Sequence, residues 1–214
     1  MIGDIIHIKK HHLPPAHKIF DMIRESVQES KKVYTITIGG ESGSGKSTLG
    51  LAIQQVLQES GYKSFIFHID DYFKLPPKDN HENRLKTLAN VGPQEVDLDL
   101  LQKHIELAKK GVKKLEKPLV HYKENQIRYV SVDMSDVDVI IVEGTYTTVL
   151  KGIDCKVFML RNYEDTYENR VNRARDPIIP FNEEVLKIEH GIIKEHAKKA
   201  HILVDKNYLI HPQK

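Results

Sequence analysis

Residues 39–48, GGESGSGKST, form a glycine-rich stretch between two segments of regular structure. The run before them, VYTITIGG (33–40), is rich in β-branched residues and predicts a buried strand. The stretch after them (46–60) has apolar residues at a helical spacing and ends at Gly61, so it predicts a helix. A strand that is apolar on both faces, followed so closely by a helix, favours a mainly parallel sheet covered by helices.

The rest of the chain repeats this alternation of strands and helices. The apolar runs and amphipathic stretches predict strands at 64–70, 137–144, 155–160 and 201–206, and helices at 96–111 and 183–200. The basic run KKGVKKLEK (109–117) is interpreted as a solvated helix end. Together these segments predict an α/β domain with helices on both faces of the sheet.

Residues 1–32 are expected to form an N-terminal extension packed on this domain. The extension holds a short strand in DIIHI (4–8) and a helix over 15–30. The hydrophobic fraction of 40% in 214 residues suits one domain with a sizeable core.

Composition excludes several classes of protein. The net charge of +2, from 32 basic and 30 acidic residues, favours neither nucleic acid nor an acidic membrane as partner. Cys155 is the only cysteine, so no internal disulfide forms and a reducing cytoplasm is the expected location. No apolar run approaches the roughly 20 residues that span a bilayer, and the short apolar N-terminus contains an acid, unlike a signal peptide.

Residues 40–47 match the pattern G-x-x-x-x-G-K-[ST] at every fixed position. Glycines let the backbone curl so that its N–H groups converge on a phosphate, and the helix N-terminus adds partial positive charge. The lysine can reach the β- and γ-phosphates, and the serine hydroxyl can ligate Mg²⁺. We therefore expect a nucleoside triphosphate to bind at Gly40, Glu41, Ser42, Gly43, Ser44, Gly45, Lys46, Ser47 and Thr48.

Acidic residues follow two of the predicted strands. Asp70 and Asp71 close the strand at 64–70, and Glu143 closes the strand at 137–144. Ligands bind at the carboxyl ends of parallel strands, so these acids should face the phosphates. An acid there can accept a proton from an attacking hydroxyl or help to hold Mg²⁺. Ordinary strand-end turns are the alternative interpretation.

Three arginines, Arg170, Arg173 and Arg175, lie in ENRVNRARDP. A spacing of three places the first two on one side of a helix, where they could neutralise the charge of a transferring phosphoryl group. A solvated basic face is the alternative. The twelve histidines show no zinc-ligand spacing.

The ordered motifs over about residues 33–206 resemble the uridine kinase and phosphoribulokinase group of P-loop kinases. After the glycine-rich loop come HIDDYFK, PQEVDLDLL, KPLVHYKENQI, VIIVEGTY, RVNRARD and IIKEHAKKAHILV. Many nucleotide-binding proteins share the loop, whereas the ordered set is far more specific. The resemblance implies a three-layer P-loop fold with a mainly parallel five-stranded sheet, and a kinase domain over 33–214 with a lid around 170–183.

The resemblance also implies ATP-dependent phosphorylation of a small-molecule hydroxyl with Mg²⁺. Asp70 would be the catalytic base, beside Lys46, Arg170, Arg173 and Arg175 as catalytic or lid residues. Ser47, Glu143 and Asp70 would lie near the metal. The residues in contact with the acceptor would be Asp71, Tyr72, Val91, Tyr122 and Asn125. Asp71 remains the alternative to Asp70 as catalytic base.

Departures from the uridine kinase pattern concern the acceptor. Val91 stands near the position of an aspartate that contacts ribose in uridine kinases, and Val120-His121 replaces a Tyr-Asp pair. A site that lacks these groups should bind that hydroxyl poorly, so we expect uridine to be a poor acceptor. The alternative function is a P-loop ATPase or nucleotide-dependent switch acting on a protein partner. No nucleic acid or membrane partner is expected, and the sequence leaves homo-oligomerisation open.

Overall fold

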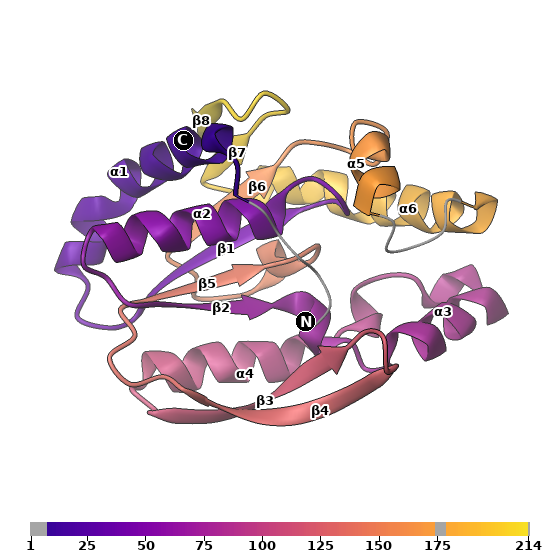
Figure 1. The fold of residues 1–214 in the computed structure, drawn as a ribbon, viewed down its shortest axis with the longest axis horizontal. Helices are drawn as coiled ribbons and strands as arrows, with labels where there is room; N and C mark the ends of the chain where they lie inside the picture. The colour runs from indigo at the N-terminus through magenta and orange to yellow at the C-terminus, as the bar shows by residue number, and fades with distance from the viewer. Residues whose placement is uncertain (1–7, 174–178, 214) are drawn as a thin grey trace.

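The structure, a computed structural model, describes residues 8–173 and 179–213 and is built on a central sheet. The strands of this sheet are β1 (Tyr34–Gly40), β2 (Ser64–His68), β5 (Val139–Glu143), β6 (Cys155–Met159), β7 (Ile202–Val204) and β8 (Ile210–Pro212). Their spatial order is β2-β5-β1-β6-β7-β8 (Figure 1). All neighbouring pairs are parallel except β7 and β8. The predicted mainly parallel five-stranded sheet is thus confirmed, with β8 as an added antiparallel edge.

Two apolar cores lie on the two faces of the sheet. Alternate residues of β5 serve each face, because Val139 and Ile141 belong to one core and Ile140 and Val142 to the other. One core is covered by α1 (Leu13–Glu29) and α2 (Lys46–Glu59). The other is covered by α4 (Leu98–Lys109) and a separate hairpin of β3 (Lys114–His121) and β4 (Gln126–Asp133). The fold therefore has the three layers expected of a P-loop kinase domain.

The remaining helices gather beyond the carboxyl ends of the parallel strands (Figure 1). They are α3 (Pro77–Lys86), α5 (Tyr167–Arg173) and α6 (Pro180–Ile193). Short 3₁₀ turns join or extend the main elements, among them η2 (Ile69–Tyr72), η4 (Pro93–Glu95), η5 (Thr147–Val149) and η6 (Lys194–Lys199). Among the helices of the described ranges, none combines the length and apolar character needed to cross a membrane.

The structure corrects several predicted boundaries. The strand expected over 64–70 ends at His68, and the helix expected over 183–200 is divided into α6 and η6. Interpreting 109–117 as a solvated helix end is wrong for Lys117, which lies in β3 and is 4% exposed. The strand expected at 4–8 falls almost wholly outside the described residues, whereas the expected N-terminal helix is α1 and packs against α2.

Gly144 lets the chain turn sharply at the end of β5. Its φ of +148° is rare for residues with a side chain, and a Cβ built there would lie 1.8 Å from Cγ2 of Ile69. The end of β5 is therefore pressed directly against η2. This contact holds Glu143 beside the turn that carries Asp70 and Asp71.

We expect Gly144→Ala to lower the free energy of unfolding by about 1–3 kcal/mol or more, because overpacking and backbone strain add. Urea unfolding measures the change. Gly191→Ala in α6 is the matched control, since a Cβ there meets nothing within 4 Å and its φ is not in the left-handed region. That control should be neutral or slightly stabilising. Equal stability of Gly144→Ala and the unsubstituted chain would contradict the tight contact.

Candidate active site

The loop between β1 and α2 is shaped to receive an anion. Gly43 has a φ of +75°, and a Cβ there would lie 3.0 Å from Cγ of Arg170. The N-cap residue of α2 is Gly45, which has no side chain to cap the helix, and the first N–H groups of α2 face the loop. Lys46 is buried, and its Nζ donates to the carbonyl oxygen of Glu41 at 2.7 Å. A helix N-terminus that begins at a glycine, with an ammonium group beside it, is suited to phosphate.

The Glu41 side chain fastens this loop to the carboxyl-end helices. Its Oε2 accepts a hydrogen bond from the Tyr163 backbone N–H at 2.6 Å, and its Oε1 lies 2.7 Å from Nδ1 of His190 in α6. The sequence predicts Glu41 only as part of the loop. Nothing local in the sequence indicates His190, because its partner lies 149 residues away.

Glu143 lies at the centre of a second polar group. The Ser47 hydroxyl donates to Oε2 of Glu143 at 3.0 Å, and Nδ1 of His68 lies 2.7 Å from Oε1. The register of the sheet causes this meeting, since His68 and Glu143 are paired residues of β2 and β5. Sequence analysis brings Ser47 and Glu143 together but misses His68.

The hydroxyl of Ser47 and the carboxylate of Glu143 suit Mg²⁺, which takes oxygen ligands and commonly binds through one or two carboxylates plus substrate phosphates. Within residues 8–173 and 179–213, no three His, Cys, Asp or Glu side chains converge on a metal position. A cation at Ser47 and Glu143 would therefore draw its remaining ligands from phosphate and water.

Asp70 and Asp71 are consecutive in η2 but occupy different environments. Asp71 is 1% exposed; its Oδ2 accepts from Nζ of Lys117 at 2.8 Å, and its Oδ1 accepts from the Val120 N–H at 3.0 Å. Asp70 is half-buried. Successive residues of a 3₁₀ turn point about a third of a turn apart, which separates the two carboxylates. Asp71 therefore anchors the β3–β4 hairpin, whereas Asp70 stays at the strand ends.

The residues predicted for the acceptor pocket separate into two groups. Tyr72 is a core residue, because it is buried among apolar side chains and its hydroxyl lies 2.8 Å from Nδ1 of His104. Burial, with a contribution from Asp71, raises the pKa of Tyr72. Val91 is also buried, as is Val120.

Tyr122 and Asn125 lie in the turn of the hairpin, and this turn meets α3. Oδ1 of Asn125 accepts from the Lys78 backbone N–H at 2.7 Å, and its Nδ2 donates to Asp79 at 2.9 Å. Asn125 has a φ of +52°, which asparagine tolerates better than most residues. Tyr122 is half-buried in the same turn. These bonds fix the position of the hairpin turn relative to α3.

The predicted lid arginines are only partly described. Nη1 of Arg170 donates to Oε1 of Glu183 at 2.7 Å, and its Nη2 donates to the carbonyl oxygen of Tyr163 at 3.1 Å. Its stem lies near Gly43, so it packs against the phosphate loop. Arg173 is the last residue of α5, and Arg175 lies outside the described residues.

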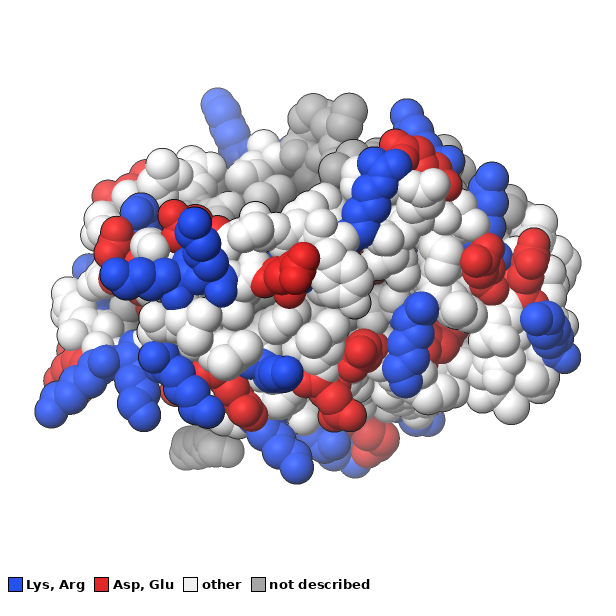
Figure 2. All heavy atoms as spheres, turned by 90° about the horizontal axis from the view of Figure 1, so that it is seen from below, with Lys and Arg blue, Asp and Glu red and all other residues white. Residues whose placement is uncertain are grey.

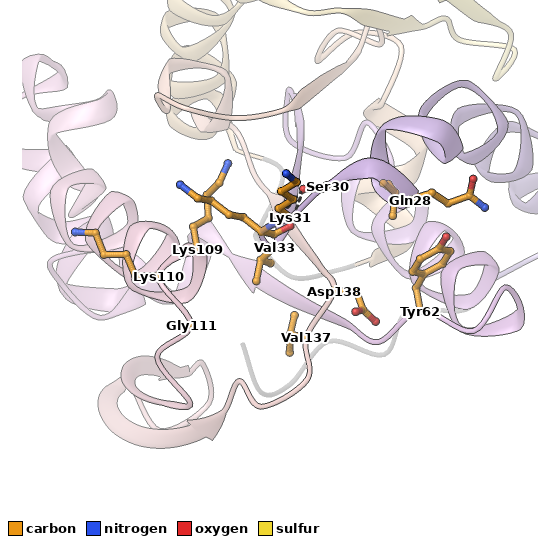
Figure 3. A pocket seen from close by; sticks show the side chains of 12 residues that line it. Gln28, Ser30, Lys31, Val33, Tyr62, Lys109, Lys110, Gly111, Val137 and Asp138 are labelled. Carbon is orange, nitrogen blue, oxygen red and sulfur yellow. Dashed lines mark hydrogen bonds between the residues drawn. The ribbon is translucent and has the colours of Figure 1, made fainter.

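A cavity of about 620 Å³ opens at the amino ends of the parallel strands, opposite the phosphate loop (Figure 3). Residues just before β1 and β5 line it, together with the C-terminal ends of α1 and α4 and several lysines. Helix C-termini carry partial negative charge, which the lysines offset, and Nζ of Lys109 is already bonded to Asp154 at 2.9 Å. This cavity is lined by helix C-termini and not by a glycine-rich loop before a helix N-terminus, so its geometry differs from that of the phosphate loop.

Basic and acidic side chains are interspersed over the face drawn in Figure 2. Surfaces that bind nucleic acid gather basic side chains into a patch or stripe. The described part of this face shows no continuous stripe of that kind. It therefore does not resemble a surface for nucleic acid.

Comparisons with known proteins agree with this geometry. A family profile described as "Phosphoribulokinase / Uridine kinase family" matches residues 35–177. The uridine kinase of Staphylococcus aureus is 30% identical over 182 residues, which cover 79% of this chain and 85% of that protein. A bifunctional alpha-galactosidase/sucrose kinase of Mediterraneibacter gnavus is 28% identical over 192 residues, covering 83% of this chain but only 20% of that protein.

Solved structures show the same fold at lower identity. The phosphoribulokinase of Rhodobacter spheroides superposes with a TM-score of 0.64 at 16% identity, covering 82% of this chain and 71% of that one. The D-glycerate 3-kinase of Cryptococcus neoformans superposes with a TM-score of 0.65 at 12% identity, covering 96% of this chain and all of that one. The family profile spans more than half of the chain and confirms the resemblance drawn from the motifs. This chain belongs to the phosphoribulokinase/uridine kinase family.

Proposed function

We propose that this chain is an ATP-dependent kinase that transfers the γ-phosphate to a hydroxyl of a small molecule of sugar or nucleoside type. One observation carries the proposal: the loop suited to an anion, the Ser47–Glu143 pair and the half-buried Asp70 all lie at the carboxyl ends of the strands of one sheet. Membership of the kinase family supports it.

The residues of the loop account for nucleotide binding in this proposal. The N–H groups at the start of α2 and the ammonium of Lys46 hold the phosphates, and Ser47 and Glu143 hold Mg²⁺. Bound Mg²⁺ supplies charge neutralisation on the phosphate oxygens. The Lys46 bond to the Glu41 carbonyl would be exchanged for phosphate oxygens when the nucleotide binds. Arg170 adds positive charge beside the loop.

Asp70 performs the proton transfer in the proposed reaction. The acceptor oxygen forms a bond to the γ-phosphorus while the bond from that phosphorus to the β,γ-bridging oxygen breaks, and ADP leaves with the bonding pair. The hydroxyl proton passes to the Asp70 carboxylate. Asp71 is unsuited to this role, because both of its oxygens accept bonds from the hairpin and water does not reach it.

Two observations bear on the acceptor: the first argues against ribose binding as in uridine kinases, and the second supports a sugar. Val91 and Val120 are buried and apolar, so neither side chain can bond a ribose diol. A relative that aligns with most of this chain is named a sucrose kinase in one of its two activities. The acceptor is therefore proposed to differ from uridine.

Lys46→Ala should reduce phosphoryl transfer by at least about tenfold, because a charged contact to the phosphates is worth roughly 1.5–3 kcal/mol. Coupled detection of ADP measures turnover, and titration with a non-hydrolysable ATP analogue measures binding. The exposed Lys103 of α4 gives the control Lys103→Ala, which should leave both quantities unchanged. Full transfer activity in Lys46→Ala would refute the proposed role of the loop.

Asp70→Asn and Asp71→Asn should fail in different ways. Asp70→Asn should lower kcat by about 10²–10⁴ with little change in stability, because the general base is lost. Asp71→Asn should lower the free energy of unfolding by about 3–5 kcal/mol, because Lys117 is left buried without its counter-charge. Steady-state kinetics and urea unfolding of both variants separate the roles. A stable Asp71→Asn variant without turnover, beside an active Asp70→Asn variant, would exchange the assignments.

Uridine and cytidine should show kcat/KM values at least about tenfold below that of the best sugar, because each missing polar contact to a buried hydroxyl costs roughly 1–3 kcal/mol. The measurement is acceptor-dependent ADP release at saturating ATP across nucleosides, sugars and simple polyols. Uridine as the best acceptor would contradict the interpretation of Val91 and Val120. ADP release that no acceptor stimulates would favour an ATPase or switch.

A further inference from the structure

A buried polar cluster lies outside the residues assigned above. It joins Arg84 of α3, Glu95 of η4 and Glu189 of α6. Nη2 of Arg84 donates to Oε2 of Glu95 at 2.9 Å and to Oε1 of Glu189 at 3.1 Å. The cluster thus connects three segments that are far apart in sequence.

Glu95 is fully occupied within this cluster. Besides the two nitrogens of Arg84, it accepts bonds from Nδ2 of Asn80 at 2.9 Å and from the Gly92 N–H at 2.8 Å. Its side chain is 2% exposed. Glu95 therefore holds Arg84 in place and has no capacity left for a ligand.

Arg84 and Glu189, unlike Glu95, each have an atom that can still form hydrogen bonds. Among the described residues, no group bonds Nη1 of Arg84 or Oε2 of Glu189. Their side chains remain 17% and 11% exposed, so a small molecule can approach them. A donor and an acceptor are thus available side by side.

Tyr146 adds a third unused group. It follows β5, is 1% exposed, and its hydroxyl has no partner among the described residues. Tyr146 follows Gly144, the residue whose turn presses the end of β5 against η2, so its side chain lies at the carboxyl ends of the strands. Burial raises the pKa of Tyr146, and the carboxylates of Glu189 and Glu95 raise it further. An unpaired buried hydroxyl costs about 1–3 kcal/mol, so a bound group that reached the Tyr146 hydroxyl would relieve that cost.

The cluster lies between the two halves of the proposed site. On the side of the phosphate loop, His190 follows Glu189 in α6, and its Nδ1 lies 2.7 Å from Oε1 of Glu41. Arg84 and Glu95 belong to the segments that flank Val91 on the acceptor side. An acceptor hydroxyl that is in line with the transferred phosphate has to lie between these two halves.

We infer that Arg84, Glu189 and Tyr146 bind the hydroxyl groups of an uncharged, polyhydroxylated acceptor such as a neutral sugar. The inference rests on the proposed kinase function. Glu95 is a positioning residue that orients Arg84. Neighbouring donors and acceptors of this kind match adjacent hydroxyls, which both donate and accept.

The charge of the cluster selects against anionic acceptors. One guanidinium faces two carboxylates, and Glu95 already neutralises it through two bonds. A phosphate or carboxylate on the acceptor would approach Glu189 without a free cation from this cluster to balance it. This separates the chain from family members named for acidic acceptors, such as D-glycerate 3-kinase.

Ranking acceptors in the unsubstituted chain tests the charge selection. With saturating ATP and Mg²⁺, kcat/KM for sucrose or fructose should exceed that for fructose 6-phosphate and D-glycerate by at least about tenfold. An anionic compound as good as the best neutral sugar would overturn the inference while leaving the kinase function intact. Absence of acceptor-dependent ADP release throughout this panel, with nucleosides added, would instead contradict the proposed function and the inference together.

Two variants test the residues. Tyr146→Phe should raise the acceptor KM roughly two- to tenfold, with the KM for ATP and the Tm unchanged or the Tm raised. Tyr129→Phe, at an exposed tyrosine of β4, is its control. A clear fall in Tm would show that the Tyr146 hydroxyl has a structural partner and would overturn its role as a ligand.

Glu189→Gln should reduce the ratio of kcat/KM for the neutral sugar to that for fructose 6-phosphate by about tenfold, because one negative charge is removed. Glu184→Gln on the exposed side of α6 is the control and should leave the ratio unchanged. A purely structural role of Glu189 would lower activity on both acceptors equally and leave the ratio constant, which would overturn the inference.

Discussion

Parallel pairing of β1, β2 and β5 decides where chemistry can occur in this protein. In the register of the sheet, Ile38 of β1 and His68 of β2 both pair with Glu143 of β5. The carboxyl ends of all three strands therefore lie together. The phosphate loop follows β1 there, and η2 follows β2. The same pairing places helix N-termini at these carboxyl ends and helix C-termini at the amino ends. Helix N-termini stabilise a bound phosphate and helix C-termini do not, so the carboxyl ends of the strands are the better place for a triphosphate.

The buried pair of Asp71 and Lys117 attaches the acceptor side to the carboxyl ends of the strands. Two buried charges gain little net stability over an apolar pair, but each becomes costly when the other is removed. The geometry they impose is specific, since Asp71 also accepts the Val120 N–H. In the proposed reaction, the neighbouring Asp70 performs the proton transfer, whereas Asp71 anchors the hairpin. Under that proposal, two consecutive acids have different roles, one in anchoring the hairpin and one in the reaction.

Local patterns were sufficient to predict the sheet, the loop and the acids at its strand ends. Apolar runs and a glycine-rich turn depend on neighbours in sequence, so one chain is enough to recognise them. The β3–β4 hairpin is not predicted, because the apolar residues of β4, Ile127, Tyr129, Val130 and Val132, do not alternate regularly and none of them is fully buried. The sequence indicates a solvated Lys117, which is wrong, because its burial depends on the carboxylate of Asp71, 46 residues away. His68, Arg84 and Glu189 were missed for the same reason, since each acquires its role from a distant partner.

Helix α6 links the two halves of the site through adjacent residues. Glu189 bonds Arg84 on the acceptor side, and His190 bonds Glu41 of the phosphate loop. Adjacent helical residues point about 100° apart, so one helix can contact two different walls of the site. Because the backbone between them is rigid, any shift of α6 that alters one contact must alter the other. In the proposed reaction, the alignment of acceptor and phosphate therefore depends on α6 as well as on the residues that touch the substrates.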